Sequence, residues 1–242
     1  MKHMMHRLIQ LLISLAIPAI AFADPVRILP LGDSLTAQGE ARKALYDQLT
    51  AAGYDFVFVG SQGAAPLRHE GHGGYTIGPD ESQPGNLSDN VGAWIPAARP
   101  DIIMLLIGNN DYNGKPGVDP SGAPARLSAL LNKVHDLAPD ATVLVGSVLK
   151  IAFVDDYAGA LNREIPEIVR QQQAVGHKVT FADLHNEVDL IKGAPPYNGT
   201  DSDYVDGTHL SASGGNKLAA GWLAYLKPIL DSSTNKKQTT TP

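Results

Sequence analysis

The sequence contains no cysteine among its 242 residues. This absence excludes disulfide bonds, cysteine nucleophiles and thiolate metal sites, so the fold has to be stabilised by its buried core. Charged residues are also sparse: they make up 18% of the chain, and the formal net charge is −6. Because nucleic-acid-binding proteins carry clusters of Lys and Arg, we expect no nucleic-acid partner for this mildly acidic chain.

A long hydrophobic run is absent from the body of the chain, where no stretch approaches the roughly 20 apolar residues that a membrane span requires. At the N-terminus, the basic residues Lys2 and Arg7 come before an apolar stretch, 8–20. This stretch is followed by Ala21-Phe22-Ala23. This pattern is typical of a secretory signal peptide, although a buried N-terminal helix would share its apolar character. We therefore expect residues 1–23 to be removed and the mature protein to be secreted or periplasmic, with no stable membrane insertion.

Internal repeats and linkers are absent as well. Residues 24–230 are expected to form one domain, followed by a polar tail, 231–242, that is expected to be disordered. Short apolar segments alternate with segments of helical periodicity, which predicts an α/β fold with a parallel sheet covered by helices on both faces. The expected strands are 26–31, 54–60, 101–108, 141–149 and 178–184, and the main expected helices are 41–52, 124–137, 156–175 and 211–226, the last ended by Pro228.

Polar and glycine residues follow several of these strands. The first strand is followed by Gly32-Asp33-Ser34, the second by the glycine-rich segment 68–78 and the third by 108–111. A long connection after the fifth strand ends with Asp206 and His209. Because ligands bind outside the carboxyl ends of parallel strands, these residues are expected to gather at one edge of the sheet.

The residue types at this edge suit acyl transfer. A serine hydroxyl such as that of Ser34 is a weak nucleophile until a base takes its proton, and His209 is a suitable base. Asp206 lies three residues before His209, close enough to hold the imidazole in the required tautomer. Backbone N–H groups and an asparagine amide can stabilise a developing oxyanion. Taken alone, however, Gly32-Asp33-Ser34 is an ordinary turn sequence.

Four sequence blocks carry a resemblance to a known family. They are GDSL at 32–35, a glycine in the GGYT segment at 73–76, GNND at 108–111 and DGTH at 206–209. In this order they resemble the blocks of the GDSL, or SGNH, hydrolases. The segment HEGHGG at 69–74, with its following aromatic and threonine, is further similar to carbohydrate esterase family 3, the acetyl-xylan esterase-like branch.

The resemblance implies a flavodoxin-like three-layer α/β/α sandwich with a five-stranded parallel sheet, and no cofactor. It implies that Ser34 is the nucleophile, with Asp206 and His209 completing a catalytic triad. It also implies an oxyanion hole formed by the N–H of Ser34, the N–H of Gly74 and the side chain of Asn110. Gly71 and Gly73 are nearby alternatives to Gly74, and Leu210 follows His209 where the branch often has proline.

Several neighbouring side chains are candidates for other roles. Asp33 is expected to support its turn and is also a candidate for substrate binding, and Asp111 is expected to support its loop. The other substrate-binding candidates are His72, Tyr75 and Tyr112. His69 and His72 are three residues apart in a loop, whereas metalloprotease histidines are four apart on a helix, so no metal site is expected.

Alternatives remain at two levels. His185 also follows the fifth strand and is a rival base, but it lacks the D-x-x-H context of His209. The predicted function is hydrolysis of short acyl esters, acetyl foremost, on a polysaccharide such as xylan or on a small ester. A lipase, thioesterase or lysophospholipase acting on longer acyl chains is an alternative, as is a non-catalytic carbohydrate-binding protein on the same fold.

Overall fold

The computed structural model of the protein describes residues 24–81 and 84–239, with side chains described up to Ser232. The predicted signal peptide therefore lies outside the described residues. The described chain forms a parallel sheet whose main strands lie in the order β2-β1-β4-β5-β6, with a short strand β3 that also pairs with β1. The strands are β1 (Val26–Gly32), β2 (Phe56–Phe58), β3 (Glu70–Gly71), β4 (Ile102–Leu106), β5 (Thr142–Gly146) and β6 (Val179–Ala182).

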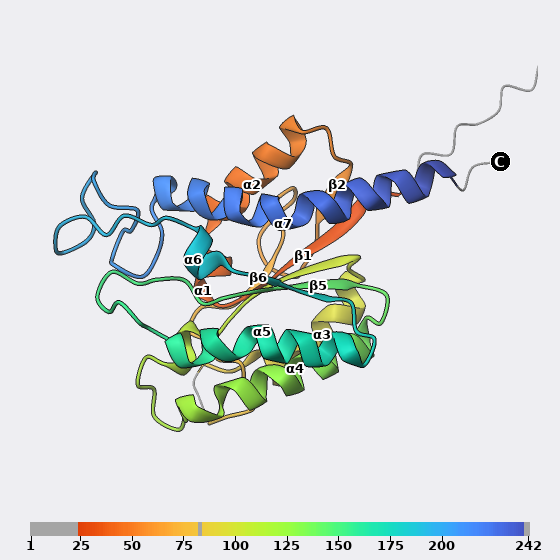
Figure 1. The fold of residues 1–242 in the computed structure, drawn as a ribbon. Coiled ribbons are helices and arrows are strands. Elements are labelled where there is room, and N and C mark those ends of the chain that lie inside the picture. The colour runs from red at the N-terminus through yellow and green to blue at the C-terminus, as the bar shows by residue number, and fades with distance from the viewer. Residues whose placement is uncertain (1–23, 82–83, 240–242) are drawn as a thin grey trace, which may run out of the picture.

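Helices cover both faces of this sheet, as Figure 1 shows. Helices α2 and α7 pack together on one face, and α3, α4 and α5 lie on the other. The helices are α1 (Ser34–Ala37), α2 (Gly39–Ala51), α3 (Leu87–Ala98), α4 (Ala123–Leu137), α5 (Gly159–Ala174), α6 (Leu184–Glu187) and α7 (Ala212–Thr239), with short 3₁₀ turns η1 (Asn109–Asp111) and η2 (Pro120–Gly122). The predicted three-layer α/β/α architecture is confirmed.

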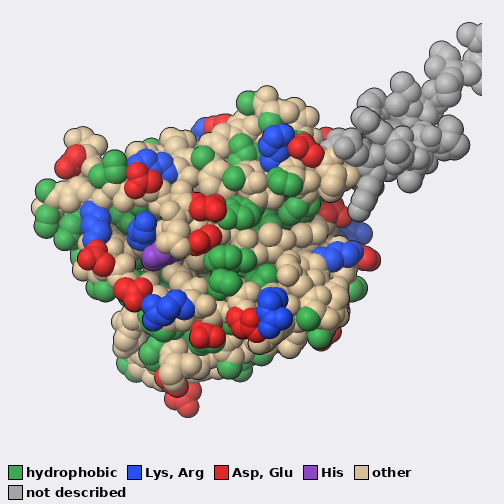
Figure 2. All heavy atoms as spheres, viewed as in Figure 1, with side chains coloured by type: hydrophobic (Ala, Val, Ile, Leu, Met, Phe, Trp, Pro, Cys, Tyr) green, Lys and Arg blue, Asp and Glu red, His purple; other side chains and the backbone are tan. Residues whose placement is uncertain are grey.

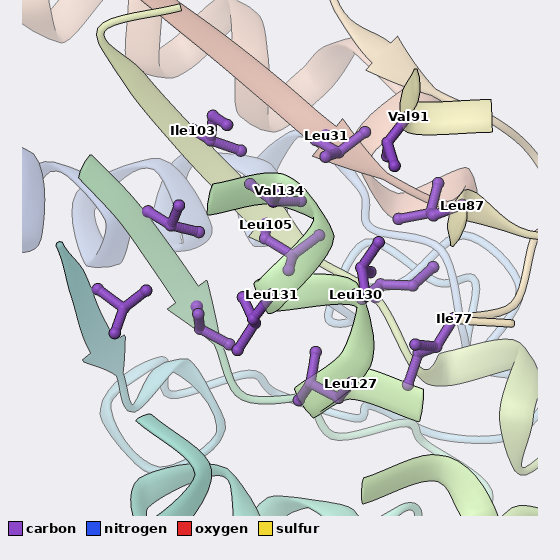
Figure 3. Close-up of a cluster of buried hydrophobic side chains, with 14 of the residues drawn as sticks. Leu31, Ile77, Leu87, Val91, Ile103, Leu105, Leu127, Leu130, Leu131 and Val134 are labelled. Carbon is purple, nitrogen blue, oxygen red and sulfur yellow. The ribbon is translucent and has the colours of Figure 1, made fainter. Parts of the chain in front are cut away.

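The layers are held by two apolar cores, one on each side of the sheet. Strand β4 is buried along its whole length, as a strand covered on both faces requires. Figure 3 shows one core, in which side chains of β1 and β4 meet the apolar faces of α3 and α4. The other core packs α2 and α7 against the opposite face of the sheet. The carboxyl edge of the sheet is thus fixed from both sides.

The surface agrees with the low charge of the sequence. On the face drawn in Figure 2, Lys and Arg side chains lie singly among Asp and Glu side chains. This face carries no basic patch of the kind that nucleic-acid-binding proteins use. Within the described ranges, none of the helices has an apolar stretch sufficient to cross a bilayer.

Two features differ from the sequence-based expectation. Strand β3 is an addition to the five expected strands: it pairs with Leu31 and Gly32, where β1 continues beyond its pairing with β2. Helix α7 continues through Pro228 to Thr239, so the predicted end at Pro228 is wrong. Leu230 is buried, and the Tyr54 hydroxyl donates to Asp231 at 2.7 Å, so tertiary packing offsets the backbone bond that Pro228 cannot make.

Candidate active site

The turn after β1 presents Ser34 at the carboxyl edge of the sheet. Gly32 ends the strand so close to its neighbour that a Cβ there would lie 2.1 Å from the carbonyl oxygen of Leu106. The Asp33 carboxylate then caps α1 by accepting the N–H of Leu35 at 3.0 Å. Ser34 is the first residue of α1. The chain therefore needs glycine at position 32 to enter the turn and a capping side chain at position 33 to start the helix.

Ser34, His209 and Asp206 form a continuous chain of hydrogen bonds. The distance from Ser34 Oγ to His209 Nε2 is 2.9 Å, and from His209 Nδ1 to Asp206 Oδ2 it is 2.7 Å. Ser34 and His209 are 175 positions apart in the sequence, and the fold places their side chains within hydrogen-bond distance. A hydroxyl, an imidazole and a carboxylate in this order have the geometry of a nucleophile, its base and the group that orients the base.

The Asp206 carboxylate is held in its ionised form by local hydrogen bonds. Partial burial acts to raise its pKa, but the bond from the His209 ring and the bonds from the backbone N–H groups of His209 and Thr208 outweigh burial and lower the pKa. Both backbone bonds go to Oδ1, which leaves Oδ2 for the imidazole. An ionised Asp206 favours the His209 tautomer that has its proton on Nδ1 and a free lone pair on Nε2.

The glycine-rich loop after β3 forms a tight turn at the site. The N–H of Tyr75 donates to the carbonyl of His72 at 3.2 Å, and Gly74 has φ of 79°, which is the arrangement of a type II turn with glycine at its third position. The N–H of Gly71 is taken by His69 Nδ1 at 3.1 Å, which removes Gly71 from the alternatives. Within the described chain, the N–H groups of Ser34 and Gly74 donate to no acceptor, so both remain available for a ligand.

Asn110 lies in η1, directly after β4, and is buried. Its amide nitrogen donates to the carbonyl of Tyr75 at 2.9 Å, and its amide oxygen accepts from Asn113 Nδ2 at 3.0 Å. These two bonds fix which end of the amide is nitrogen and leave one N–H of that nitrogen for another acceptor. Asn110 thus holds the glycine turn in place, and one N–H of its amide remains for a ligand.

The His72 side chain supports the same turn through ring stacking and a hydrogen bond. Its ring stacks on Trp94, with centroids 4.2 Å apart, and on Tyr75 at 4.9 Å, and its Nε2 lies 2.7 Å from Glu70 Oε1. Its backbone N–H donates to the carbonyl of Gly32 at 2.9 Å, which ties the loop to the end of β1. The His72 side chain is 15% exposed, and its role in substrate binding stays a prediction.

Glu70 is a buried neighbour of the site that sequence reasoning missed. Its buried carboxylate accepts the N–H and the hydroxyl of Ser61 at 2.7 and 2.8 Å, in addition to its contact with His72. Burial acts to raise the pKa of Glu70, but these bonds outweigh it and lower the pKa. The sequence signal was present in the HEGH segment, where the acid stands two residues before a histidine.

Two further carboxyl groups are buried beneath the site. Asp33 is 1% exposed and accepts the N–H of Leu35, as expected of a residue that supports its turn, while its role in substrate binding stays a prediction. Burial raises the pKa of Asp33 to about 7. Asp111 accepts the N–H of Ile77 at 3.1 Å and pairs with Arg126 at 2.8 Å, which confirms its role as a loop support. Burial raises the pKa of Asp111 above its ordinary value despite these partners.

The remaining candidates, Tyr112 and His185, make no contact with the Ser34–His209–Asp206 chain among the hydrogen bonds described. The Tyr112 ring packs edge-on against Tyr157, whose hydroxyl donates to the carbonyl of Asn109 at 2.6 Å. His185 Nδ1 lies 2.9 Å from the carbonyl of Val148, and it is His209, not His185, that bonds to Ser34. Over the residues that the structure describes, no group of three or more His, Asp or Glu side chains is arranged to hold a metal ion.

Comparisons with known proteins agree with this arrangement. Residues 31–216 match the GDSL-like lipase/acylhydrolase family. A solved family 3 carbohydrate esterase from Clostridium thermocellum is 32% identical, with a TM-score of 0.69, over 86% of this chain and 98% of that chain. A family 3 carbohydrate esterase from Talaromyces cellulolyticus has a TM-score of 0.68 at 23% identity, over 86% and 99% of the two chains, which is a likeness of fold.

A multidomain esterase from Ruminococcus flavefaciens is 28% identical over 90% of this chain. The chain spans only 30% of the length of that relative, so the similarity concerns one part of a larger protein. The family match covers most of the chain and includes Ser34, Gly74, Asn110, Asp206 and His209. The chain therefore belongs to the GDSL-like lipase/acylhydrolase family and is a carboxylic ester hydrolase.

Proposed function

We propose that this protein is a secreted serine esterase that removes short acyl groups, acetyl foremost, from a polysaccharide such as xylan. The observation that carries the catalytic part is the hydrogen-bonded chain Ser34–His209–Asp206, with distances of 2.9 and 2.7 Å. The N-terminal pattern of residues 1–23 supports secretion. The similarity to a family 3 carbohydrate esterase supports a carbohydrate ester as substrate.

The proposed reaction proceeds in two halves. His209 Nε2 takes the proton of Ser34 as Oγ attacks the ester carbonyl carbon, and the oxyanion is stabilised by the N–H groups of Ser34 and Gly74 and by the Asn110 amide. When the tetrahedral intermediate collapses, His209 gives this proton to the leaving alcohol oxygen and an acyl-Ser34 ester remains. Water, deprotonated by His209, then attacks that ester, and collapse of the second intermediate returns the proton to Ser34 and releases the carboxylic acid.

The surroundings of the nucleophile support a short acyl group. The loop 68–78 is polar and glycine-rich rather than apolar. A long acyl chain would need an apolar wall, which this loop does not provide.

The experiment is covalent labelling by a fluorophosphonate, with peptide mapping of the modified residue. We expect the label on Ser34, and we expect Ser34→Ala to fold normally and to lose on the order of 10⁴-fold or more in kcat. Ser232→Ala is the matched control, because Ser232 is exposed on α7 and its hydroxyl donates to the carbonyl of Ile229 in the same helix. Labelling at another serine, with Ser34 unmodified, would exclude the proposed mechanism.

A further inference from the structure

Strongly exposed apolar side chains gather beside the proposed triad. Within the described part of the chain, five large apolar side chains are strongly exposed, and four of them lie on the loop between β5 and α5 (147–158) or on the loop between α6 and α7 (188–211). These four are Phe153, Val154, Ile191 and Val205. Exposed apolar groups concentrated near a site are a mark of ligand binding.

The loop 147–158 is attached to both halves of the site. The N–H of Ala152 donates to the carbonyl of Gly207 at 2.7 Å, on the turn that carries Asp206 and His209. The Tyr157 hydroxyl donates to the carbonyl of Asn109, on the oxyanion side. The residues between these two attachments, of which Phe153 is the first, therefore run across the carboxyl edge between the triad and the oxyanion donors.

The Phe153 ring is fixed from two sides and open on another. It packs against Gly207 so closely that a Cβ on that glycine would lie 2.3 Å from its ring. The Tyr197 ring meets it edge-on, with centroids 5.3 Å apart and an angle of 84° between the planes. Phe153 nevertheless remains 56% exposed. A rigid aromatic surface is thus presented next to the turn that holds the general base.

The chemistry decides which half of an ester lies on this side. His209 Nε2 takes the proton of Ser34 and must return it to the leaving alcohol oxygen, so the alcohol half of the ester has to lie on the His209 side of the nucleophile. The carbonyl oxygen lies on the opposite side, toward Gly74 and Asn110. Phe153 contacts the triad turn, and it therefore borders the place of the alcohol half.

The surroundings of the ring indicate what kind of alcohol fits. An ion pair between Lys192 and Asp155 joins the two loops beside it, and the carboxylate of Asp206 is half exposed. A flat apolar face with a charged and polar rim is complementary to a sugar ring, which has C–H groups on its faces and hydroxyls at its edge.

We propose that Phe153, backed by Tyr197, forms a stacking platform for the pyranose ring that carries the acyl group. This inference rests on the proposed function, since it uses His209 as the group that protonates the leaving alcohol. It adds a binding site for the alcohol half of the substrate, separate from the groups that perform the chemistry.

The test compares two substrates that differ in the alcohol half: an acetylated methyl xyloside and ethyl acetate. Phe153→Leu keeps an apolar group against Gly207 but removes the flat face, and Phe153→Trp keeps a flat face. We expect Phe153→Leu to lower kcat/KM for the xyloside about three- to tenfold, mainly through KM, and to change ethyl acetate hydrolysis less than twofold. Phe153→Trp retains the xyloside activity. Val175→Ala is the matched control, since it removes an exposed apolar group that lies outside these two loops.

Two results would overturn the platform. Equal losses on both substrates in Phe153→Leu would mean that Phe153 only supports the triad turn, and an unchanged kcat/KM for the xyloside would mean that no stacking occurs. Failure of the proposed function has a different signature: Ser34→Ala would then retain hydrolysis of ethyl acetate, whatever the Phe153 variants do.

Discussion

At the residue scale, the site is built from groups that each have two tasks. Asn110 holds the carbonyl of Tyr75 and keeps one N–H for a ligand. Asp206 accepts two backbone N–H groups through one oxygen and the His209 ring through the other. Such doubly bonded side chains have little freedom, so the donors and acceptors are oriented before substrate arrives, which is the condition for electrostatic stabilisation of a transition state.

Replacing Asn110 tests the oxyanion hole. Asn110→Ala should lower kcat for p-nitrophenyl acetate about 10²–10³-fold, the usual loss for one oxyanion donor. KM should change little, because the oxyanion exists only in the transition state and the intermediate. Thermal unfolding of the variant provides the check on folding. An unchanged kcat in a folded Asn110→Ala variant would remove Asn110 from the mechanism.

Asp33 predicts a pH dependence of stability. Burial raises its pKa to about 7 from the ordinary 3.8, and its Oδ2 has no hydrogen-bond partner in the described chain. Between about pH 4 and 7 the folded protein keeps a proton on Asp33 that the unfolded chain has released, so the free energy of unfolding falls as pH rises through this window. Above about pH 7 both states are ionised and the loss is complete. Its neighbours Asp111 and His209 act in opposite directions on this pKa.

The substitution Asp33→Asn isolates this effect. Asparagine keeps an oxygen to cap α1 but cannot ionise, so its stability relative to the wild type should increase from pH 4 to pH 7.5 by up to about 4 kcal/mol. Urea unfolding of both proteins at several pH values measures the difference. A difference that stays constant across the range would show that Asp33 keeps an ordinary pKa in the folded protein.

At the scale of elements, the short strand β3 and its loop carry much of the site. Glu70 lies in β3, where it binds Ser61 and His72, and His72 in turn packs on Trp94 and on Tyr75. The Gly74 turn therefore rests on a connected set of contacts that begins at a buried carboxylate. We regard Glu70 as a positioning residue, because it acts on the reaction only through this turn.

The variant Glu70→Gln is expected to loosen that turn. It keeps the size of the side chain but removes the charge that strengthens the bond to His72. We expect kcat to fall about tenfold with KM little changed, which is less than the loss of a whole oxyanion donor. Glu164→Gln, at an exposed position on α5, is the matched control. A lower melting temperature with normal kcat would assign Glu70 a role in folding alone.

These elements also show which parts of the fold and of the site can be predicted from the sequence. The alternation of apolar segments predicted the three layers, and the polar residues after each strand predicted the edge at which Ser34 and His209 meet. Strand β3 was missed because Glu70-Gly71 is too short and too polar to show a strand pattern. The end of α7 was misplaced because Pro228 is a strong local signal that packing of Leu230 overrides. The stack of His72 on Trp94 joins positions from separate elements, and no local pattern records such a contact.

At the scale of the whole molecule, the site is a rigid edge supported by two cores. The buried apolar clusters on the two faces of the sheet hold β1 and β4, whose ends carry Ser34 and Asn110. Since the chain has no cysteine, these cores must supply its stability without the help of a disulfide. The loops above this edge are tied by hydrogen bonds and an ion pair, and they define the space that a substrate can enter.

This arrangement predicts the preferred acyl length. If an apolar groove received the acyl chain, each added CH₂ would contribute about 0.8 kcal/mol and activity would rise from acetate to octanoate. The loop 68–78 beside the nucleophile is polar and glycine-rich and offers no apolar wall of this kind. We therefore expect kcat/KM in a series of p-nitrophenyl esters to fall beyond about butyrate, because the pocket excludes longer chains. Acetate release from acetylated xylan, measured alongside, should be abolished in Ser34→Ala. A maximum at octanoate or longer, with no acetate released from xylan, would favour a lipase and would leave the assignment of Ser34, His209 and Asp206 unchanged.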